Sequence, residues 1–307
     1  MTELRHRREV VGDVRLHWVE EGEGAPVVLL HGFPDFWYGW RYQIPALAAA
    51  GYRAVAPDLR GYAASDKPEG IESYRLDLLG GDVVGLLDTL GAERAHLVGH
   101  DWGGALAWWV AAHHPDRVSR LTVVNAPHPL AMRRALRGPA QLLRSWYVLL
   151  FQVPGLPERL FRAFDYELVE RIMRRDIRRR DVLHETDFLR YADALSRPDA
   201  LRSMLHWYRA AFREGLRGLM PWARRRIPVR AGAWRVEAPT LVVWGERDPW
   251  LGPGLLRDLE RWVPDLLVER IAHGGHWVHV EAWERVNRTL LWFLGQREAS
   301  EPPPPPT

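Results

Sequence analysis

Residues 98–104 read VGHDWGG and place Asp101 at the centre of a G-x-D-x-G frame. Gly99 and Gly103 have no Cβ, so a strand can turn sharply into a helix there and lift the Asp101 side chain above a sheet. A carboxylate with an ordinary pKa of about 4 is ionised at neutral pH, whereas a serine in this place must first lose a proton. Asp101 is therefore predicted to be a nucleophile that attacks saturated carbon and forms an alkyl ester.

Two later motifs can supply the water activation that cleavage of such an ester needs. Residues 271–278 read IAHGGHWV and place His276 in a Gly-rich loop, and residues 241–250 read LVVWGERDPW and place Asp248 beyond the preceding strand. The chain order nucleophile, acid, histidine is that of α/β-hydrolases. We predict that Asp248 orients the imidazole and that His276 deprotonates the water. His273 and His279 are predicted to be surface or packing residues.

An oxyanion site is predicted from a second Gly-rich loop, residues 31–34, which reads HGFP. In this fold one N–H belongs to the residue after the nucleophile, here Trp102, and another comes from this loop. Pro34 has no N–H, so Phe33 is the expected second donor. His31 is predicted to be a structural residue that fixes the loop.

The elements around these motifs alternate between strands and helices. Apolar strand patterns cover residues 14–20, 26–30, 54–57, 95–98 and 118–124, and helical periodicity covers residues 74–90 and 103–112. Strand patterns return at residues 240–244 and 266–271, before a closing helix over residues 281–294. This alternation predicts an α/β fold with a mostly parallel sheet covered by helices on both faces.

A helical block interrupts the alternation. We predict an α/β core over residues 1–128, an inserted all-helical cap over 129–236, the second part of the core over 237–296, and an extended, disordered Pro-rich tail over 297–307.

Composition places few further bounds on function. The 307 residues carry a net charge of +3, contain no cysteine and have one lysine, Lys67. This balance gives no reason to expect a nucleic-acid partner, and the absence of cysteine excludes disulfides and thiolate chemistry. The N-terminal MTELRHRREV has no apolar signal core and no stretch reaches the length of a membrane span, so we expect a cytoplasmic protein without membrane insertion.

Four segments together resemble one known family. HGFPDFWYGWRYQIPALAAAGYRAVAPDLRGYAASDKP, GHDWGG, GERD and GGHW are similar to the epoxide hydrolases of the α/β-hydrolase fold, and the resemblance covers residues 10–296. It implies the cofactor-independent hydrolysis of an epoxide to a vicinal diol through an alkyl ester on Asp101. No metal cluster or nucleotide-binding loop is expected.

The resemblance also implies two tyrosine acids in the cap. SWYVLLFQVPG, residues 145–155, matches the first family segment and places Tyr147 in its tyrosine position; HWYR, residues 206–209, matches the second and places Tyr208 there. An epoxide oxygen leaves as an alkoxide and needs a proton, which a phenol can donate. Tyr166 and Tyr191 lie in the same block, but their contexts do not match.

Haloalkane and fluoroacetate dehalogenases share the Asp nucleophile and remain the alternative. Trp102 is compatible with haloalkane dehalogenases, which hold halide on an indole N–H at this position, but these enzymes usually have Asn where this chain has Phe33. Fluoroacetate dehalogenases usually have Arg where this chain has Trp102. Both departures favour the epoxide. A non-catalytic receptor of the same fold should lack part of the catalytic set, and here every expected member is present.

The substrate is predicted to be a small hydrophobic epoxide, with water as co-substrate. An apolar pocket for it is expected from Phe33, Pro34, Trp37, Trp102 and Trp277, which lie in or next to the motifs. The arginine-rich segments at residues 171–180 and 224–230 are predicted to be solvated cap faces. The sequence leaves a monomer and a homodimer both open.

Overall fold

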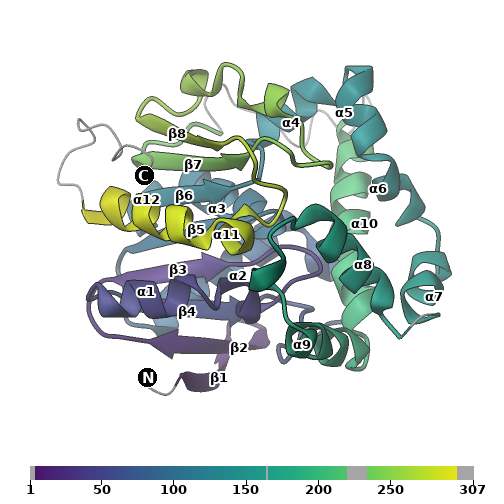
Figure 1. The fold of residues 1–307 in the computed structure, drawn as a ribbon, viewed down its shortest axis with the longest axis horizontal. Helices are drawn as coiled ribbons and strands as arrows, with labels where there is room; N and C mark the ends of the chain where they lie inside the picture. The colour runs from purple at the N-terminus through teal and green to yellow at the C-terminus, as the bar shows by residue number, and fades with distance from the viewer. Residues whose placement is uncertain (1–3, 164, 220–233, 296–307) are drawn as a thin grey trace.

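The computed structural model describes residues 4–163, 165–219 and 234–295, which are built around one eight-stranded sheet (Figure 1). The strand order is β1-β2-β4-β3-β5-β6-β7-β8. The pairs from β4 through β8 are parallel, whereas β1 pairs with β2, and β2 with β4, in antiparallel fashion. This confirms the predicted α/β fold with a mostly parallel sheet. The strands are β1 (Arg5–Val11), β2 (Val14–Glu21), β3 (Pro26–Leu30), β4 (Arg53–Asp58), β5 (Ala95–His100), β6 (Val118–Val124), β7 (Thr240–Gly245) and β8 (Leu266–Ile271).

The edge strand β1 was not predicted from the sequence. Its residues read RHRREVV, and all but Val11 are exposed, so it lacks the apolar alternation of a half-buried strand. Charged side chains on an edge strand discourage pairing with another chain. The charged sequence that prevented its prediction as a strand is therefore the one expected at the edge of a sheet.

Helices cover both faces of the sheet, because alternate residues of the buried strands point to opposite sides. Val28 and Leu30 of β3 belong to the apolar core under α2 and α3, and Val27 and Leu29 to the core under α1 and α12. Figure 1 shows α1 and α12 in front of the strands. These helices are α1 (Gln43–Ala49), α2 (Leu76–Thr89), α3 (Trp102–His113), α11 (Val278–Glu281) and α12 (Trp283–Gly295). Short 3₁₀ helices are η1 (Trp37–Trp40), η2 (Ile71–Tyr74), η3 (Pro115–Arg117), η4 (Arg180–Val182), η5 (Pro253–Leu256) and η6 (Leu259–Arg261).

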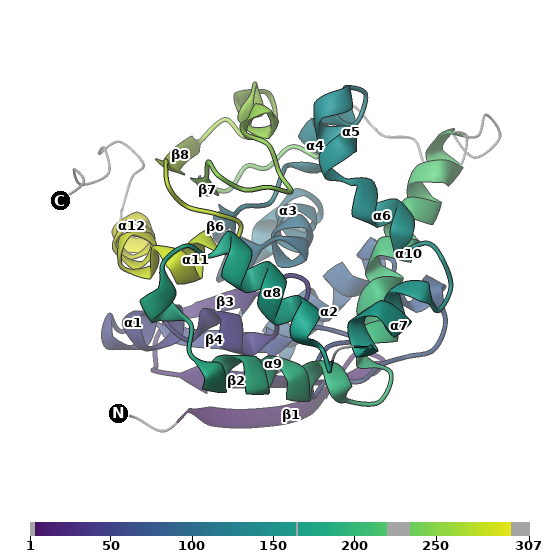
Figure 2. The same ribbon diagram turned by 45° about the vertical axis from the view of Figure 1, so that its right-hand side comes forward.

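Seven further helices lie between β6 and β7 and form a separate layer beside the sheet (Figures 1 and 2). We refer to them as the cap helices. They are α4 (Pro129–Ala135), α5 (Pro139–Arg144), α6 (Trp146–Leu150), α7 (Leu156–Arg162), α8 (Glu167–Asp176), α9 (Glu185–Ser196) and α10 (Ala200–Leu219). Over the part of 129–236 that the structure describes, the predicted helical character holds and no strand occurs.

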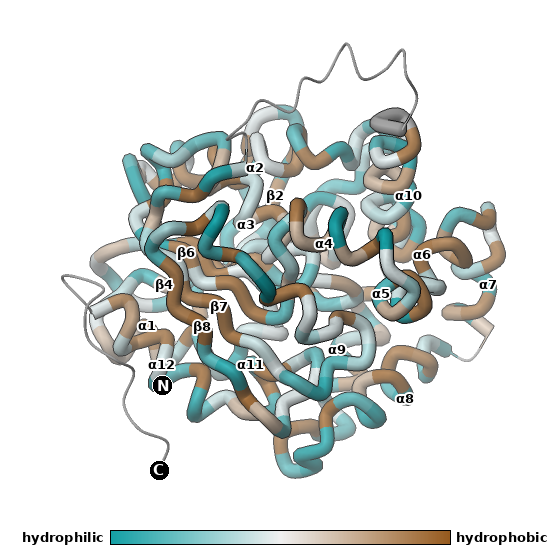
Figure 3. The backbone as a smooth tube through the Cα atoms, turned by 90° about the horizontal axis from the view of Figure 1, so that it is seen from above, coloured by the Kyte–Doolittle hydropathy of each residue, from teal (hydrophilic) through white to brown (hydrophobic). Residues whose placement is uncertain are grey.

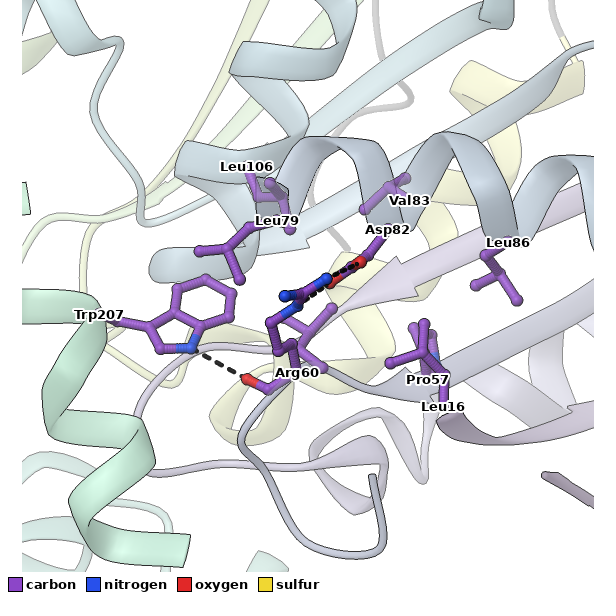
Figure 4. Close-up of a pocket in the computed structure, with 10 residues that line it drawn as sticks. Leu16, Pro57, Arg60, Leu79, Asp82, Val83, Leu86, Leu106 and Trp207 are labelled. Atoms are coloured by element: carbon purple, nitrogen blue, oxygen red, sulfur yellow. Dashed lines mark hydrogen bonds and ion pairs between the residues drawn. The ribbon is translucent and has the colours of Figure 1, made fainter. Parts of the chain in front are cut away.

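Buried polar contacts attach the cap helices to the core. Trp207 of α10 donates its indole N–H to the carbonyl of Arg60 at 3.0 Å, beside a cavity of about 10 Å³ (Figure 4). The guanidinium of Arg60 is itself held by Asp82 of α2 at 2.6 Å. A second attachment is the hydrogen bond of 2.7 Å from the Tyr38 hydroxyl to Asp187 of α9. The cap helices therefore have a fixed position over the carboxyl ends of β3 and β4.

The predicted closing helix differs in detail from the observed one. Glu281 lies at the end of α11, and α12 begins only at Trp283, because Ala282 leaves helical geometry between them. The predicted Pro-rich tail and the arginine-rich segment at 224–230 lie outside the described residues, whereas the segment at 171–180 is described and carries ion pairs such as Arg174 with Glu170. No helix among the described residues is long and apolar enough to cross a membrane.

Candidate active site

Asp101 stands at the sharp turn between β5 and α3. Its backbone φ of 51° and ψ of −117° lie outside the regions that residues with a side chain normally adopt. The turn needs glycine at its base, since a Cβ at Gly103 would collide with the carbonyl of Leu30 and one at Gly99 with the carbonyl of Gly103. The predicted strand–turn–helix context of the motif is therefore observed, and strain of this kind is typical of functional positions.

The carboxylate of Asp101 is held from one side by backbone N–H groups. The Phe33 N–H donates to Oδ1 at 2.8 Å, and the Trp102 backbone also donates to the carboxylate. His31 keeps this loop in place, because the Leu59 N–H donates to its Nε2 at 3.0 Å and its Nδ1 donates to the Gly32 carbonyl at 2.9 Å. The structural role predicted for His31 is confirmed, and the two predicted donors lie on the same carboxylate.

His276 lies on the other side of Asp101 and contacts Asp248. Its Nδ1 is 2.7 Å from Asp248 Oδ2, and its Nε2 is 3.8 Å from Asp101 Oδ2. Asp248 also accepts hydrogen bonds from the backbone N–H groups of Trp250 at 2.7 Å and Leu251 at 2.9 Å. The acid is thus fixed from several directions and holds the imidazole with Nε2 toward the nucleophile. His273 is exposed and has no place in this group.

The charges of these residues are coupled. Burial acts to lower the pKa of His276, but the charge and hydrogen bond of Asp248, followed by the charges of Asp101 and Asp176, outweigh it and raise this pKa to about 9. Burial raises the pKa of Asp101, against the opposing charge of His276 and the two backbone donors. His276 therefore carries its proton at neutral pH, with the carboxyl groups of Asp248 and Asp101 on either side of it.

The cap helices contribute Tyr147 from α6 and Tyr208 from α10. Their rings meet edge to face with centroids 5.9 Å apart, and the Tyr208 ring also lies 5.0 Å from that of Trp102. Burial raises the pKa of both phenols, and the charge of Asp101 raises both further. Both hydroxyls therefore stay protonated beside the nucleophile at neutral pH and can donate hydrogen bonds.

Further aromatic rings pack around the two tyrosines. Phe33 lies 5.3 Å from Tyr208 between ring centroids, and Phe151 lies 4.9 Å from the same ring. Trp250 packs edge to face on Tyr147 at 5.1 Å. Of these, Phe151 and Trp250 were not singled out in the sequence, because they carry no motif of their own.

Three of the residues predicted to line the substrate pocket do not form aromatic ring contacts with Tyr147 or Tyr208. The Trp37 ring contacts His6, Phe36 and Tyr38, away from the two tyrosines. Trp277 is 2% exposed and packs edge to face against the buried side of His276 at 5.0 Å. Pro34 is buried directly after Phe33. The structure therefore brings Phe33 and Trp102 together with the tyrosines, but not Trp37.

Asn125 is a member of the site that the sequence did not reveal. It follows β6 with a φ of 41°, and its side chain donates to Asp248 Oδ2 at 2.6 Å while accepting from the Gly245 N–H at 2.8 Å. The residue thus supports the acid from the strand next to it. Its position directly after the β6 strand pattern is the signal that could have indicated it, since the nucleophile and the acid also follow strand ends.

Asp35, His100 and His279 form a buried polar group behind the nucleophile. Their ligand-type atoms lie within 4.8 Å of one another, and Asp35 Oδ2 and the Nδ1 atoms of both histidines have no protein partner. Burial raises the pKa of Asp35 to about 6 and lowers those of His100 and His279 well below their usual value. A carboxylate and two neutral imidazoles are groups that can bind a divalent cation. A buried water molecule that donates hydrogen bonds to two of these atoms would give them hydrogen-bond partners as well.

Comparisons with known proteins agree with this geometry. The sequence profile of the alpha/beta hydrolase fold matches residues 25–282. The chain is 39% identical to AB hydrolase superfamily protein YfhM of Bacillus subtilis (strain 168), covering 92% of this chain and 94% of that protein, and 35% identical to mouse epoxide hydrolase 4, covering 92% and 76%. Among solved structures, the epoxide hydrolase of Bacillus megaterium in complex with an inhibitor superposes with a TM-score of 0.85 at 31% identity, over 94% of this chain and all of that one. Epoxide hydrolase A of Mycobacterium thermoresistibile superposes with a TM-score of 0.81 at 31% identity, over 95% and 98%.

Proposed function

The chain belongs to the epoxide hydrolases of the α/β-hydrolase fold, and from that premise we propose that it converts an apolar epoxide and water into a vicinal diol with Asp101, His276 and two cap tyrosines as its machinery. The observation that carries the assignment of residues is the packing of two tyrosines against each other and of Tyr208 against Trp102, the residue next to Asp101.

In the first step Asp101 attacks a carbon of the epoxide ring. Oδ2 is the attacking oxygen, because Oδ1 is held by the Phe33 N–H. The new C–O bond forms as the ring C–O bond breaks, and Tyr147 or Tyr208 protonates the ring oxygen. The products of the step are an alkyl ester on Asp101 and a tyrosinate. Acid assistance of this kind is worth about 10² to 10⁴-fold.

In the second step water hydrolyses the ester. His276 Nε2 accepts a proton from water, the resulting hydroxide adds to the Asp101 carboxyl carbon, and negative charge develops on Oδ1. The N–H groups of Phe33 and Trp102 can stabilise that charge, because Phe33 already donates to Oδ1 and Trp102 to the same carboxylate. Collapse of this intermediate breaks the bond between the carboxyl carbon and Oδ2, so Oδ2 leaves with the alkyl group. The departing oxygen takes the proton of the newly formed carboxylic acid, which gives the diol and restores the Asp101 carboxylate with one oxygen from water. The proton on His276 finally replaces the one that the tyrosine gave up.

Formation of the ester also prepares His276 for its role. An imidazole that already carries a second proton cannot act as a base. The negative charge of Asp101 is one cause of the raised pKa of His276, so it helps to keep that proton in place. Alkylation removes that charge, which lowers the pKa of His276 and favours release of its proton to bulk water before the reacting water is activated. When the diol leaves and the charge of Asp101 returns, His276 takes a proton back from bulk water. The base is thereby released only when an ester is present.

The surroundings of these residues support an apolar substrate. The rings of Phe33, Phe151 and Trp250 flank the tyrosines, and the helical insertion over residues 129–236 acts as a cap domain between core segments 1–128 and 237–296. Phe33 and Trp102 are proposed to contact substrate. Pro34 acts by packing directly after Phe33, and Trp277 by packing against His276. A cytoplasmic location stays a prediction.

Product analysis tests the proposal. Diol formation from a panel of aryl and alkyl epoxides is measured beside halide release from haloalkanes, with Asp101→Asn as the control. The control is read early, because the amide can hydrolyse back to the acid. Diol without halide, lost in the variant, supports the proposal. Halide release without diol indicates a dehalogenase in which the tyrosines only pack.

A further inference from the structure

The outer side of the cap helices is unusually apolar. Of the thirteen exposed large apolar side chains among the described residues, eight lie within residues 136–160. Leu143 is 73% exposed, Trp146 and Leu149 are 58% and Leu142 is 55%. Figure 3 shows brown, apolar tube at α6, on the rim of the molecule. We call this surface the outer cap face; it is made by Leu142, Leu143, Trp146, Leu149, Val153 and Leu156.

These side chains are exposed along three short consecutive helices: Leu142 and Leu143 lie on α5, Trp146 and Leu149 on α6, Val153 between α6 and α7, and Leu156 at the start of α7. Other side chains of the same segment are turned inward. Gln141 donates to the carbonyl of Trp250 at 2.8 Å, Phe151 is 5% exposed, and Tyr147 reaches the active site. One face of the segment is thus used by the site, and the other is left to solvent.

The same segment is cationic. Residues 129–163 contain six arginines and one acid, Glu158, which is 9% exposed and paired with Arg209 at 2.8 Å. Four of the arginines are exposed and form no ion pair with any described residue: Arg133, Arg137, Arg159 and Arg162. The segment that carries the outer cap face therefore combines exposed apolar side chains with exposed arginines that form no ion pair among the described residues.

We propose that the outer cap face binds the surface of an anionic lipid bilayer. Apolar side chains next to unpaired arginines are the composition of segments that lie in the headgroup region, with the arginines on lipid phosphates and the apolar side chains below them. The alternative occupant, a second copy of this chain in a two-fold dimer, places the same arginines against each other without an acid to offset them. Charge complementarity therefore favours the bilayer.

This surface binding differs from the membrane spans that the sequence analysis excluded. It needs no long apolar helix, only side chains that enter the headgroup region. Because Tyr147 and Trp146 are neighbours on α6, the bound surface lies directly behind the acid side of the active site. An apolar substrate dissolved in lipid would then be concentrated close to the cap.

Vesicle co-sedimentation tests the proposal without any substrate. The full chain is mixed with vesicles of phosphatidylcholine and phosphatidylglycerol in equal parts, and with vesicles of phosphatidylcholine alone. We expect clear binding to the anionic vesicles, weaker binding to the neutral ones, and loss of the difference at high salt. Leu143→Ser combined with Leu149→Ser should weaken binding about tenfold or more, and Arg133→Gln with Arg137→Gln by a similar factor.

Matched controls separate the surface from general effects. Leu189→Ser removes a leucine that is 70% exposed on α9, and Arg175→Gln removes an exposed charge on α8. Both should bind vesicles like the parent chain, and all variants should turn over a water-dissolved epoxide within about twofold of it. Equal binding by all variants overturns the proposal. A dimer in sedimentation equilibrium that Leu143→Ser with Leu149→Ser dissociates, without vesicle binding, overturns it in favour of a second copy.

Discussion

The two halves of the active site are held in different ways. The core half is fixed by directional hydrogen bonds of 2.6–2.9 Å, from Phe33 to Asp101 and from Asn125, Trp250, Leu251 and His276 to Asp248. The cap half is positioned mainly by rings that meet edge to face at 4.9–5.9 Å around Tyr147 and Tyr208. The proposed nucleophile and base need well-defined angles for reaction, whereas the proposed acids need only reach the epoxide oxygen of a bound substrate. The difference suggests that the core half sets the reaction and the cap half sets which epoxide is accepted.

Removing the base should affect the core half most strongly. His276→Gln keeps a hydrogen-bond donor toward Asp248 but cannot accept a proton from water, so turnover should fall by about 10³-fold or more while the first step survives. Intact-protein mass spectrometry should then show one covalently bound substrate per chain. Loss of turnover with no adduct would mean that His276 is also needed for ring opening.

Removing the two proposed acids, Tyr147 and Tyr208, should block the first step, the opening of the epoxide ring. Tyr147→Phe with Tyr208→Phe keeps the ring contacts but removes both hydroxyls, so ring opening should slow by about 10² to 10⁴-fold and no ester should accumulate. Tyr166→Phe, a cap tyrosine outside the site, is the matched control and should keep parental turnover. Activity of the double variant within tenfold of the parent would contradict the assignment of the acids.

The charge coupling inside the core half can be measured directly. In Asp101→Asn the carboxylate charge is absent, so the pKa of His276 should fall from about 9, as it does when the ester forms. The sign follows because a nearby anion favours the protonated imidazole and its loss favours the neutral one. NMR titration of His276, completed before the amide hydrolyses, checks this. An unchanged pKa would show that Asp248 alone sets it.

Asn125→Gly should have a moderate effect on the core half. Glycine tolerates the φ of 41° at this position but removes the donor to Asp248. We expect turnover to fall about tenfold and its rise with pH to move to higher pH, because a carboxylate with fewer donors holds the imidazolium proton more tightly. A fall in turnover with an unmoved pH profile would indicate a purely structural role.

The smallest effect on turnover is expected at the attachment of the cap. Trp207→Phe removes the hydrogen bond to the Arg60 carbonyl and leaves that acceptor buried, which should lower the free energy of unfolding by about 1–3 kcal/mol. Turnover should change only a few-fold, since the ring contacts of Tyr208 remain. Denaturant unfolding and steady-state kinetics on the same variant compare the two quantities.

Much of the core half was legible in the sequence because its chemistry depends on backbone turns. Glycines, strand patterns and chain order singled out Asp101, Asp248, His276, Phe33 and Trp102 for these roles, and the structure brings the five residues together. Asn125 escaped because a single amide after a strand has no motif. The buried group of Asp35, His100 and His279 escaped because its members are distant in sequence and meet only through the fold.

The cap half was less legible, since aromatic residues in helices look alike whether they pack or line a site. Tyr147 and Tyr208 were singled out only through resemblance to a family. The tryptophans show that nearness to a motif does not predict which rings contact these tyrosines. Trp37 lies beside a motif but its ring turns away from the tyrosines, while Trp250 and Phe151 contact them without any motif. Where side-chain rings rather than backbone atoms surround a site, proximity to a motif in the sequence is a poor predictor of which residues contact it.

The oxyanion donors have a consequence for protein engineering. At positions 33 and 102 the proposed reaction uses the main-chain N–H, while the side chain packs against the Tyr208 ring. Substitution there can change the packing around Tyr208 without deleting a proposed donor, provided that the backbone path is kept. Libraries that vary Phe33, Trp102 and Phe151 while leaving Gly99 and Gly103 untouched should therefore yield active variants with altered enantioselectivity.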